Sequence, residues 1–297
     1  MASPTPPCRS ERRFASFPGL PALVLVAFLA GLSMSAALAG ESFSFGVLSQ
    51  RSPVLTAQYW NPIFDYVQRR TGIALVLKVA RTGQESSDAT EQGLYDFVYS
   101  NHIFRPRMAA ANYQVILRPR DEAITGQVVT LAESPIRQLK DLEGKEVGFP
   151  SAAAFVGYAV PMDQLLRRNI TVTPVFGGNQ EGIMAQLKAG RVLAAGVNGQ
   201  VMKSFAQRED LRYRVLWESA PFLNLPVAVH PRVPKSVADA VRKAIDGMDG
   251  DPEGQKILQA AANLIAQPPP YGFRASSPEE YRSYTDFYKN TRLKDLQ

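Results

Sequence analysis

The chain has 297 residues, of which 45% are hydrophobic and 20% are charged, and its formal net charge is +6. This composition is typical of a globular protein and excludes a disordered, collagen-like or coiled-coil chain. The 22 prolines and 21 glycines are spread along the chain, which favours many short elements joined by turns. No run of Lys and Arg reaches five residues, so the positive charge does not indicate a nucleic-acid partner.

Cysteine and histidine are too few for the sites they usually build. The single cysteine, Cys8, excludes a disulfide framework and a cysteine-based zinc site. His102 and His230 lie far apart in the sequence, so a metal site built on several histidines is not expected. We expect neither a metal nor another cofactor.

Residues 1–39 have the features of a cleaved signal peptide. Three arginines at positions 9–13 precede an apolar stretch at residues 20–32, and a small-x-small sequence follows at residues 37–39. An uncleaved membrane anchor is the alternative, although the apolar stretch is near the lower length limit for spanning a bilayer. The protein is therefore expected to be exported to the periplasm.

The chain after residue 40 begins with alternating strand and helix patterns. Residues 42–48 alternate between apolar and polar side chains, as a strand does. The apolar residues from 55 to 67 recur at helical spacing, and this helix is expected to end at Thr71-Gly72. Further strands are predicted at residues 73–79, 96–99 and 113–117, and helices at 86–93 and 103–111.

A second alternating set follows a β-rich run at residues 127–132. Its predicted strands are 146–149, 172–176, 192–197, 213–217 and 226–230, and its helices are 136–142, 153–168, 180–189 and 202–208. Tail helices are predicted at 236–248, 254–266 and 278–291. Alternating strands and helices indicate an α/β fold with mainly parallel sheets. Two such sets predict two lobes, one of residues 42–125 and 224–297 and the other of residues 126–223.

Small or polar residues follow four of the predicted strands, and a helix start follows each of them. Ligands of open α/β sheets bind beyond the carboxyl ends of strands, where helix N-termini offer unpaired amides. Helix capping explains any one of these positions, whereas the four together favour a binding cleft. The residues expected to line this cleft are Tyr99, Ser100, Asn101, Ser151, Phe155, Tyr158, Asn179 and Asn198.

Motifs of the common enzyme classes are missing from the sequence. It contains no G-x-S-x-G, Walker A, H-E-x-x-H or G-x-G-x-x-G motif. Neither histidine has an evident nucleophile as a sequence partner. No catalytic residue is expected, and the protein is not predicted to be an enzyme.

Seven short segments carry a further signal through their order and spacing. They are residues 45–53, 59–62, 96–101, 141–149, 189–195, 216–221 and 251–254. Together they resemble the phosphonate-type periplasmic solute-binding proteins of ABC importers. The resemblance implies a type II periplasmic binding protein fold, in which two α/β lobes close on a ligand by hinge motion. It also implies a monomer that works with a membrane permease and ATPase, or with other envelope transport components.

The segment that holds the phosphonate in the resembled family differs in this chain. A helix start rich in Ser and Thr is expected there, but residues 151–158 contain one serine, three alanines and Phe155. Asn179 stands where the family has a histidine. A dianion needs several charge-assisted donors, and this cleft has lost a hydroxyl-rich loop and a cationic candidate while gaining aromatic and aliphatic surface. The ligand is therefore expected to have an apolar body, as a lipid-like compound such as a sterol has.

Two alternatives to a lipid-like ligand stay open at this point. One is a phosphonate-, phosphite- or phosphate-binding subunit of an ABC importer, since backbone amides alone can bind an anion. The other is a ligand-sensing periplasmic module of a signalling system.

Overall fold

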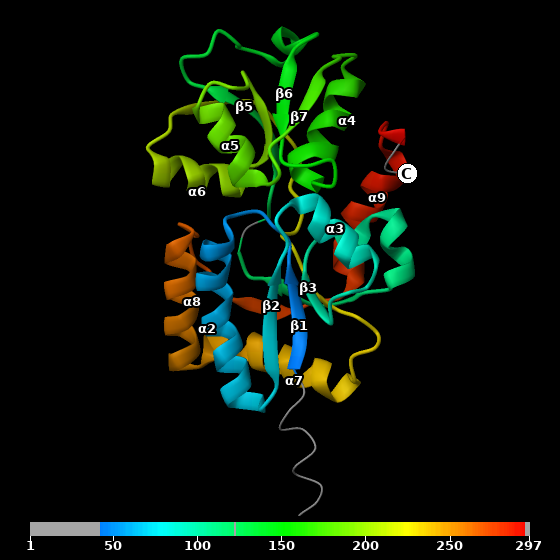
Figure 1. Ribbon diagram of the computed structural model, residues 1–297, viewed down its shortest axis with the longest axis vertical. Coiled ribbons are helices and arrows are strands. Elements are labelled where there is room, and N and C mark those ends of the chain that lie inside the picture. The colour runs from blue at the N-terminus through cyan, green and yellow to red at the C-terminus, as the bar shows by residue number, and fades with distance from the viewer. Residues whose placement is uncertain (1–41, 122, 295–297) are drawn as a thin grey trace, which may run out of the picture. The chain divides into compact units, whose positions relative to one another are not determined.

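The computed structural model describes residues 42–121 and 123–294, and two β-sheets flanked by helices divide it into two lobes (Figure 1). All described residues belong to one compact unit, Gly40–Gln297. The predicted signal peptide, residues 1–39, lies outside the described residues. Within residues 42–121 and 123–294, no helix is long and apolar enough to cross a membrane.

The six-stranded lobe is built on a sheet with the strand order β11-β4-β10-β3-β1-β2. Its strands are β1 (Ser42–Val47), β2 (Ala74–Val79), β3 (Phe97–Tyr99), β4 (Gln114–Pro119), β10 (Val227–Val229) and β11 (Phe273–Ala275). Its helices are α2 (Pro53–Thr71), α3 (Gly83–Glu91), α7 (Lys235–Asp246) and α8 (Pro252–Leu264), with 3₁₀ turns at His102–Phe104, Pro106–Ala111 and Gly247–Gly250.

Helix α2 connects the sheet of this lobe to the region where the lobes meet. It begins at Pro53 after the N-cap Ser52, whose side chain accepts a hydrogen bond from the Leu55 amide. It ends at Gly72, whose left-handed conformation (φ 75°) suits a residue without a Cβ. The inner face of α2 packs on the same side of the sheet as α7 and α8, with Trp60 as its largest buried side chain.

The five-stranded lobe is built on a sheet with the order β7-β6-β8-β5-β9. Its strands are β5 (Gly126–Leu131), β6 (Glu146–Phe149), β7 (Thr173–Phe176), β8 (Ala195–Asn198) and β9 (Tyr213–Glu218). Its helices are α4 (Val160–Arg167), α5 (Gln180–Lys188) and α6 (Gly199–Glu209), with a 3₁₀ turn at Leu139–Leu142 and a π-helical turn at Phe155–Ala159. The apolar side chains of α4 pack on one face of the sheet, and those of α5 and α6 pack on the other.

Two connections join the sheets. The chain leaves the six-stranded sheet after Pro119 and returns to it at Val227. The connections pair with each other through Ile124 and Phe222, which exchange backbone hydrogen bonds of 2.7 and 2.8 Å. A short two-stranded crossing of this kind leaves few residues to absorb a change of angle between the lobes.

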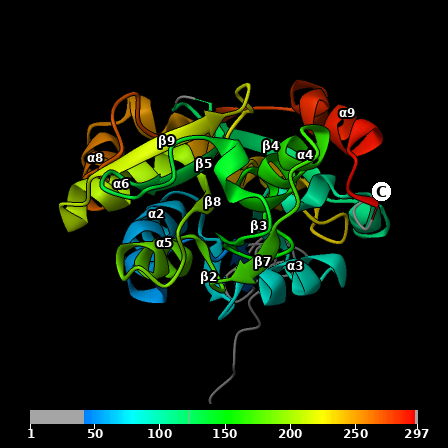
Figure 2. The same cartoon turned by 90° about the horizontal axis from the view of Figure 1, so that it is seen from above.

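The C-terminal helix α9 (Arg282–Asn290) follows a 3₁₀ turn at Pro278–Tyr281 and lies beside α4 in both views (Figures 1 and 2). Asp163 of α4 accepts hydrogen bonds from the Thr291 hydroxyl at 3.0 Å and from the Arg292 amide at 2.7 Å. Arg167 donates to the Asn290 carbonyl at 2.6 Å. The end of α9 and the residues after it are therefore hydrogen-bonded to α4 of the five-stranded lobe.

The structure confirms a two-lobed α/β fold with two helix-flanked sheets. The sheets are mixed rather than mainly parallel, because β10 and β11 pair antiparallel in one lobe and β5 pairs antiparallel with both neighbours in the other. The helix predicted at residues 103–111 is a pair of 3₁₀ turns, because Pro106 interrupts it. The helix predicted at residues 153–168 starts later, at Phe155, and its first turn is π-helical.

Candidate ligand-binding site

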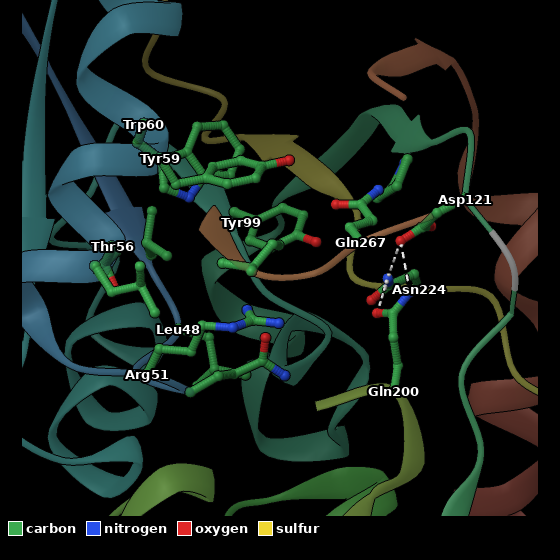
Figure 3. Close-up of a pocket in the computed structure, with 15 residues that line it drawn as sticks. Leu48, Arg51, Thr56, Tyr59, Trp60, Tyr99, Asp121, Gln200, Asn224 and Gln267 are labelled. Atoms are coloured by element: carbon green, nitrogen blue, oxygen red, sulfur yellow. Dashed lines mark hydrogen bonds between the residues drawn. The ribbon is translucent and has the colours of Figure 1, made fainter. Parts of the chain in front are cut away.

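A cavity of about 570 Å³, part of it open to solvent, lies between the loop after β1, the first turns of α2 and the start of α6 (Figure 3). We call it the first cavity. Most of its lining side chains carry a polar group, and they come from both lobes and from the connections. They are Val47, Leu48, Gln50, Arg51, Leu55, Thr56, Tyr59, Trp60, Tyr99, Pro119, Asp121, Gln200, Asn224, Ile265 and Gln267.

Arg51 supplies a positive charge to the first cavity. It lies directly before Ser52, the N-cap of α2. Its Nε atom is buried, and within the part of the chain that the structure describes it has no hydrogen-bond partner and the guanidinium has no ion-pair partner. Burial lowers the pKa of Arg51, yet an arginine side chain remains protonated in proteins. A partly buried cation without a counter-ion is unfavourable, so the cavity is electrostatically suited to an anion.

The carboxylate of Glu181 raises the pKa of Arg51 but is engaged by other groups. One of its oxygens pairs with Arg208 at 2.5 Å, and the other accepts a hydrogen bond from the Ser52 amide at 3.0 Å. Its charge is therefore largely balanced within the five-stranded lobe, and Arg51 stays available to a ligand.

Two tyrosine hydroxyls lie near the Arg51 guanidinium. Tyr59 and Tyr99 both line the first cavity, and Figure 3 shows their hydroxyls pointing into the same space as Arg51. Burial raises the pKa of both phenols, and the negative charge of Asp121 adds to the effect. The hydroxyls therefore stay protonated at neutral pH, and neither forms a hydrogen bond with a described residue. They are available as donors beside a cation.

The opposite wall of the first cavity is a network of two amides and a carboxylate. Asp121 Oδ2 accepts from Gln200 Nε2 at 3.0 Å and from Asn224 Nδ2 at 2.8 Å. Asn224 Nδ2 also approaches Gln200 Oε1 at 3.1 Å. Because Gln200 belongs to α6, this network links the five-stranded lobe to both connections (Figure 3). It fixes the orientation of the amides before any ligand arrives.

A second cavity of about 340 Å³ lies on the other side of the loop after β1. Leu48 and Gln50 line both cavities, so the two cavities adjoin at this loop. The lining of the second cavity comes from this loop, from the residues after β3 and from two helix starts of the five-stranded lobe. It consists of Leu48, Ser49, Gln50, Gly83, Asn101, His102, Pro150, Ser151, Ala154, Phe155, Val156, Gly157, Asn179 and Gln180.

The sequence matches a known protein family over most of its length. Residues 45–281 match the family of ABC transporter, phosphonate, periplasmic substrate-binding proteins. The chain belongs to this family. Its members are periplasmic substrate-binding proteins of ABC transporters, which work with permease and ATPase components. No curated protein matches the chain.

Solved structures with the same fold are similar to this chain over most of its length. The binding-protein component of an ABC phosphonate transporter from Pseudomonas aeruginosa is 16% identical, with a TM-score of 0.69 over 86% of this chain and 91% of that one. A Prochlorococcus marinus protein in complex with methylphosphonate is 12% identical, with a TM-score of 0.71 over 84% and 97% of the two chains. The alkanesulfonate-binding protein of Xanthomonas axonopodis, bound to MOPS, is 15% identical, with a TM-score of 0.58 over 84% and 92%.

Five of the eight residues predicted from the sequence line one of the two cavities of this family member. Tyr99 lines the first cavity, at the end of β3. Asn101, Ser151, Phe155 and Asn179 line the second cavity. Asn179 also caps α5, because its Oδ1 accepts from the Gly182 amide at 2.8 Å.

The other three predicted residues line neither cavity. The Tyr158 ring packs edge-on against the rings of Phe149 and Phe176, with centroid distances of 5.1 and 5.4 Å. The Ser100 hydroxyl accepts from the His102 amide at 3.1 Å. Asn198 caps α6 by accepting from the Gln200 and Val201 amides. These two polar side chains serve local backbone structure.

Arg51 is a cavity residue that the sequence expectation did not include, and it supplies a cation although Asn179 replaces the family's histidine. The expected site residues follow four later strands, and none of them follows the first strand. Applied to residues 42–48, the same rule leads to Ser49, Gln50 and Arg51. The sequence signal for this site residue is therefore an arginine at the end of a polar loop that follows a strand.

Proposed function

We propose that the protein is the periplasmic substrate-binding subunit of an ABC importer and that its ligand is a small organic anion of the phosphonate type. The anionic group would lie in the first cavity against Arg51. The observation that carries this proposal is the partially buried Arg51 guanidinium, which has no counter-ion among the described residues. The hydroxyls of Tyr59 and Tyr99 would add hydrogen bonds to the same group.

The lipid-like ligand expected from the sequence has no support in the comparisons or in the cavity. That expectation rested on the loss of hydroxyls near Ser151 and of a cationic candidate at Asn179, and Arg51 offsets the second loss. An apolar ligand would leave the Arg51 charge and the tyrosine hydroxyls without partners after water is displaced. The phosphonate alternative is therefore the better proposal, and the Prochlorococcus marinus relative holds methylphosphonate.

We propose that the lobes, divided near residues 125 and 224 as the sequence indicates, close over this ligand. Groups on the loop after β1 and at the start of α3 face groups on the five-stranded lobe. The Gln50 carbonyl accepts from the Glu181 amide at 3.2 Å, and the Gly178 carbonyl accepts from the Gly83 amide at 2.9 Å. These contacts are expected to form and break as the hinge moves.

Calorimetry on the exported protein, purified from the periplasm of an expression host, tests the proposal. Methylphosphonate, phosphate, ethanesulfonate and a sterol would be titrated into the wild type and into Arg51→Gln. We expect methylphosphonate to bind the wild type and Arg51→Gln to bind it about 10- to 100-fold more weakly, because a hydrogen bond to a charged group contributes about 1.5–3 kcal/mol. Arg81→Gln is the matched control, because Arg81 lies on the same lobe with its side chain 90% exposed.

Two results would contradict the proposal. One is a sterol that binds while no anion in the series does. The other is Arg51→Gln binding methylphosphonate as tightly as the Arg81→Gln control, which would show that the anion does not depend on the first cavity.

A further inference from the structure

The second cavity contains buried polar atoms that nothing in the described chain satisfies. His102 is 1% exposed, and neither of its ring nitrogens has a hydrogen-bond partner. Asn101 is 2% exposed, and its Oδ1 atom also has no partner. Leaving a buried donor or acceptor unpaired is unfavourable, so such groups in a folded protein usually face a ligand or a water molecule.

The chemistry of these atoms is that of an uncharged site. Burial lowers the pKa of His102 to about 3, with smaller contributions from Arg105 and Arg107, so its ring is neutral at physiological pH. A neutral imidazole presents one N–H donor and one acceptor nitrogen. Asn101 Oδ1 adds an acceptor, and the Ser151 hydroxyl makes no hydrogen bond with a described residue.

The lining of the second cavity also lacks a counter-charge for an ion. None of the described residues that line it is Asp, Glu, Lys or Arg. A formal anion placed there would face no cationic side chain, whereas the first cavity offers Arg51. A hydroxyl group donates one hydrogen bond and accepts others, which matches the mixed donors and acceptors of His102, Asn101 and Ser151.

We propose that the second cavity is a subsite for an uncharged hydroxyl group of the same ligand whose anionic group pairs with Arg51. The inference rests on the proposed function and names its substrate class as a hydroxylated organic phosphonate. The cavities share Leu48 and Gln50 as lining residues and are therefore neighbours along the loop after β1, and the proposal requires one short ligand to span both. The two cavities then select for two different groups of one molecule.

A matched ligand series tests the subsite. Ethylphosphonate, 2-hydroxyethylphosphonate and 3-hydroxypropylphosphonate carry the same anion and differ in the presence and reach of the hydroxyl. We expect calorimetry to show that at least one hydroxylated ligand binds the wild type about 10-fold more tightly than ethylphosphonate, as one added hydrogen bond in a buried site predicts.

Two variants of the second cavity and two control variants test whether the tighter binding of hydroxylated ligands arises in the second cavity. His102→Phe and Ser151→Ala should each bring the affinity for the hydroxylated ligand closer to the affinity for ethylphosphonate, so that their ratio approaches one. Ser151→Ala is the smaller change and serves as the test if His102→Phe does not fold. Arg51→Gln should weaken the binding of both ligands by a similar factor, so the ratio of their affinities should stay the same. Arg81→Gln should change neither affinity.

The results that would contradict the subsite differ from those that would contradict the proposed function. Equal binding of ethylphosphonate and both hydroxylated ligands would overturn the subsite, which would then hold water only, while the proposed function would stand. An absence of binding by all three would overturn the proposed function and the subsite with it. Loss of ethylphosphonate binding in Ser151→Ala but not in Arg51→Gln would place the anion in the second cavity and refute this assignment.

Discussion

The Phe155 ring lies 4.3 Å from the Tyr284 ring between centroids, and this contact joins the π-helical turn of the five-stranded lobe to α9. Phe222, Phe287 and Tyr288 complete an aromatic cluster around Phe155, with centroid distances of 4.8, 5.0 and 5.5 Å. Phe155 is 2% exposed. Although it borders the second cavity, its ring mainly anchors the C-terminal helix.

Phe155→Ala is therefore expected to destabilise the protein. Truncating a buried Phe costs about 3–5 kcal/mol, and one kcal/mol lowers the melting temperature of a chain of this size by about 2–4 °C. Thermal unfolding would measure the loss, which should be accompanied by easier proteolysis of α9. Phe287→Ala is a suitable comparison, because Phe287 touches the same ring from a partly exposed position and should cost less. A melting temperature equal to that of the wild type would refute the anchoring role.

Burial of His102 predicts a dependence of stability on pH. Its pKa is about 3 in the folded protein and about 6.5 in an unfolded chain, so between these values the unfolded state binds more protons. The stabilisation is fully present above pH 6.5 and is lost progressively as the pH falls toward 3. The loss amounts to about 1.4 kcal/mol for each pH unit within this window. Chemical denaturation of the wild type and of His102→Gln at pH 7.0 and 4.5 would measure it, and the variant should lose less stability on acidification.

His230 also affects the pH dependence of stability, so its contribution has to be separated from that of His102. Burial lowers its pKa as well, so it contributes in the same direction. The His230→Gln variant and the double variant would separate the two contributions. If His102→Gln lost as much stability on acidification as the wild type, His102 would not be held neutral in the fold.

The sequence predicted most elements because their periodicity follows from packing. Helix α2 buries Trp60, Ile63, Phe64 and Val67 on one face, and the helical spacing of these apolar residues along the chain is enough to indicate that face. Strand β11 was not predicted, because Phe273–Ala275 has only three residues and exists through its pairing with β4, which is far away in the sequence. The antiparallel pairing of β5 also could not be predicted from local sequence patterns, because strand direction is set by tertiary contacts.

The binding site was predictable in part for a similar reason. The rule that ligands lie beyond strand ends led to Tyr99, Asn101, Ser151 and Asn179, which line the cavities. The same rule cannot separate a side chain that faces a cavity from one that caps a helix, as Asn198 does. The interaction of Phe155 with α9 depends on where the last helix packs, and local sequence does not specify this.

Glu181 provides the last prediction, because it bridges the lobes through backbone and side chain. Its amide donates to the Gln50 carbonyl at 3.2 Å, and its carboxylate accepts from the Ser52 amide at 3.0 Å. If these contacts hold the closed form, Glu181→Ala should shift the population toward an open form and speed ligand dissociation. The expected acceleration is about 10-fold, the equivalent of one charge-assisted hydrogen bond.

Small-angle scattering and stopped-flow kinetics would check the role of Glu181. With methylphosphonate, the wild type should have a smaller radius of gyration than without it, and Glu181→Ala should need more ligand to reach the same value. Glu181→Gln keeps an oxygen that can accept from the Ser52 amide and removes the charge beside Arg51, so it separates the bridge from the electrostatic effect. Glu209→Ala, which breaks the exposed pair with Lys188 on the same lobe, should behave as the wild type. An unchanged scattering profile at saturating ligand would instead indicate a rigid cleft, in which the bonds of Glu181 are permanent.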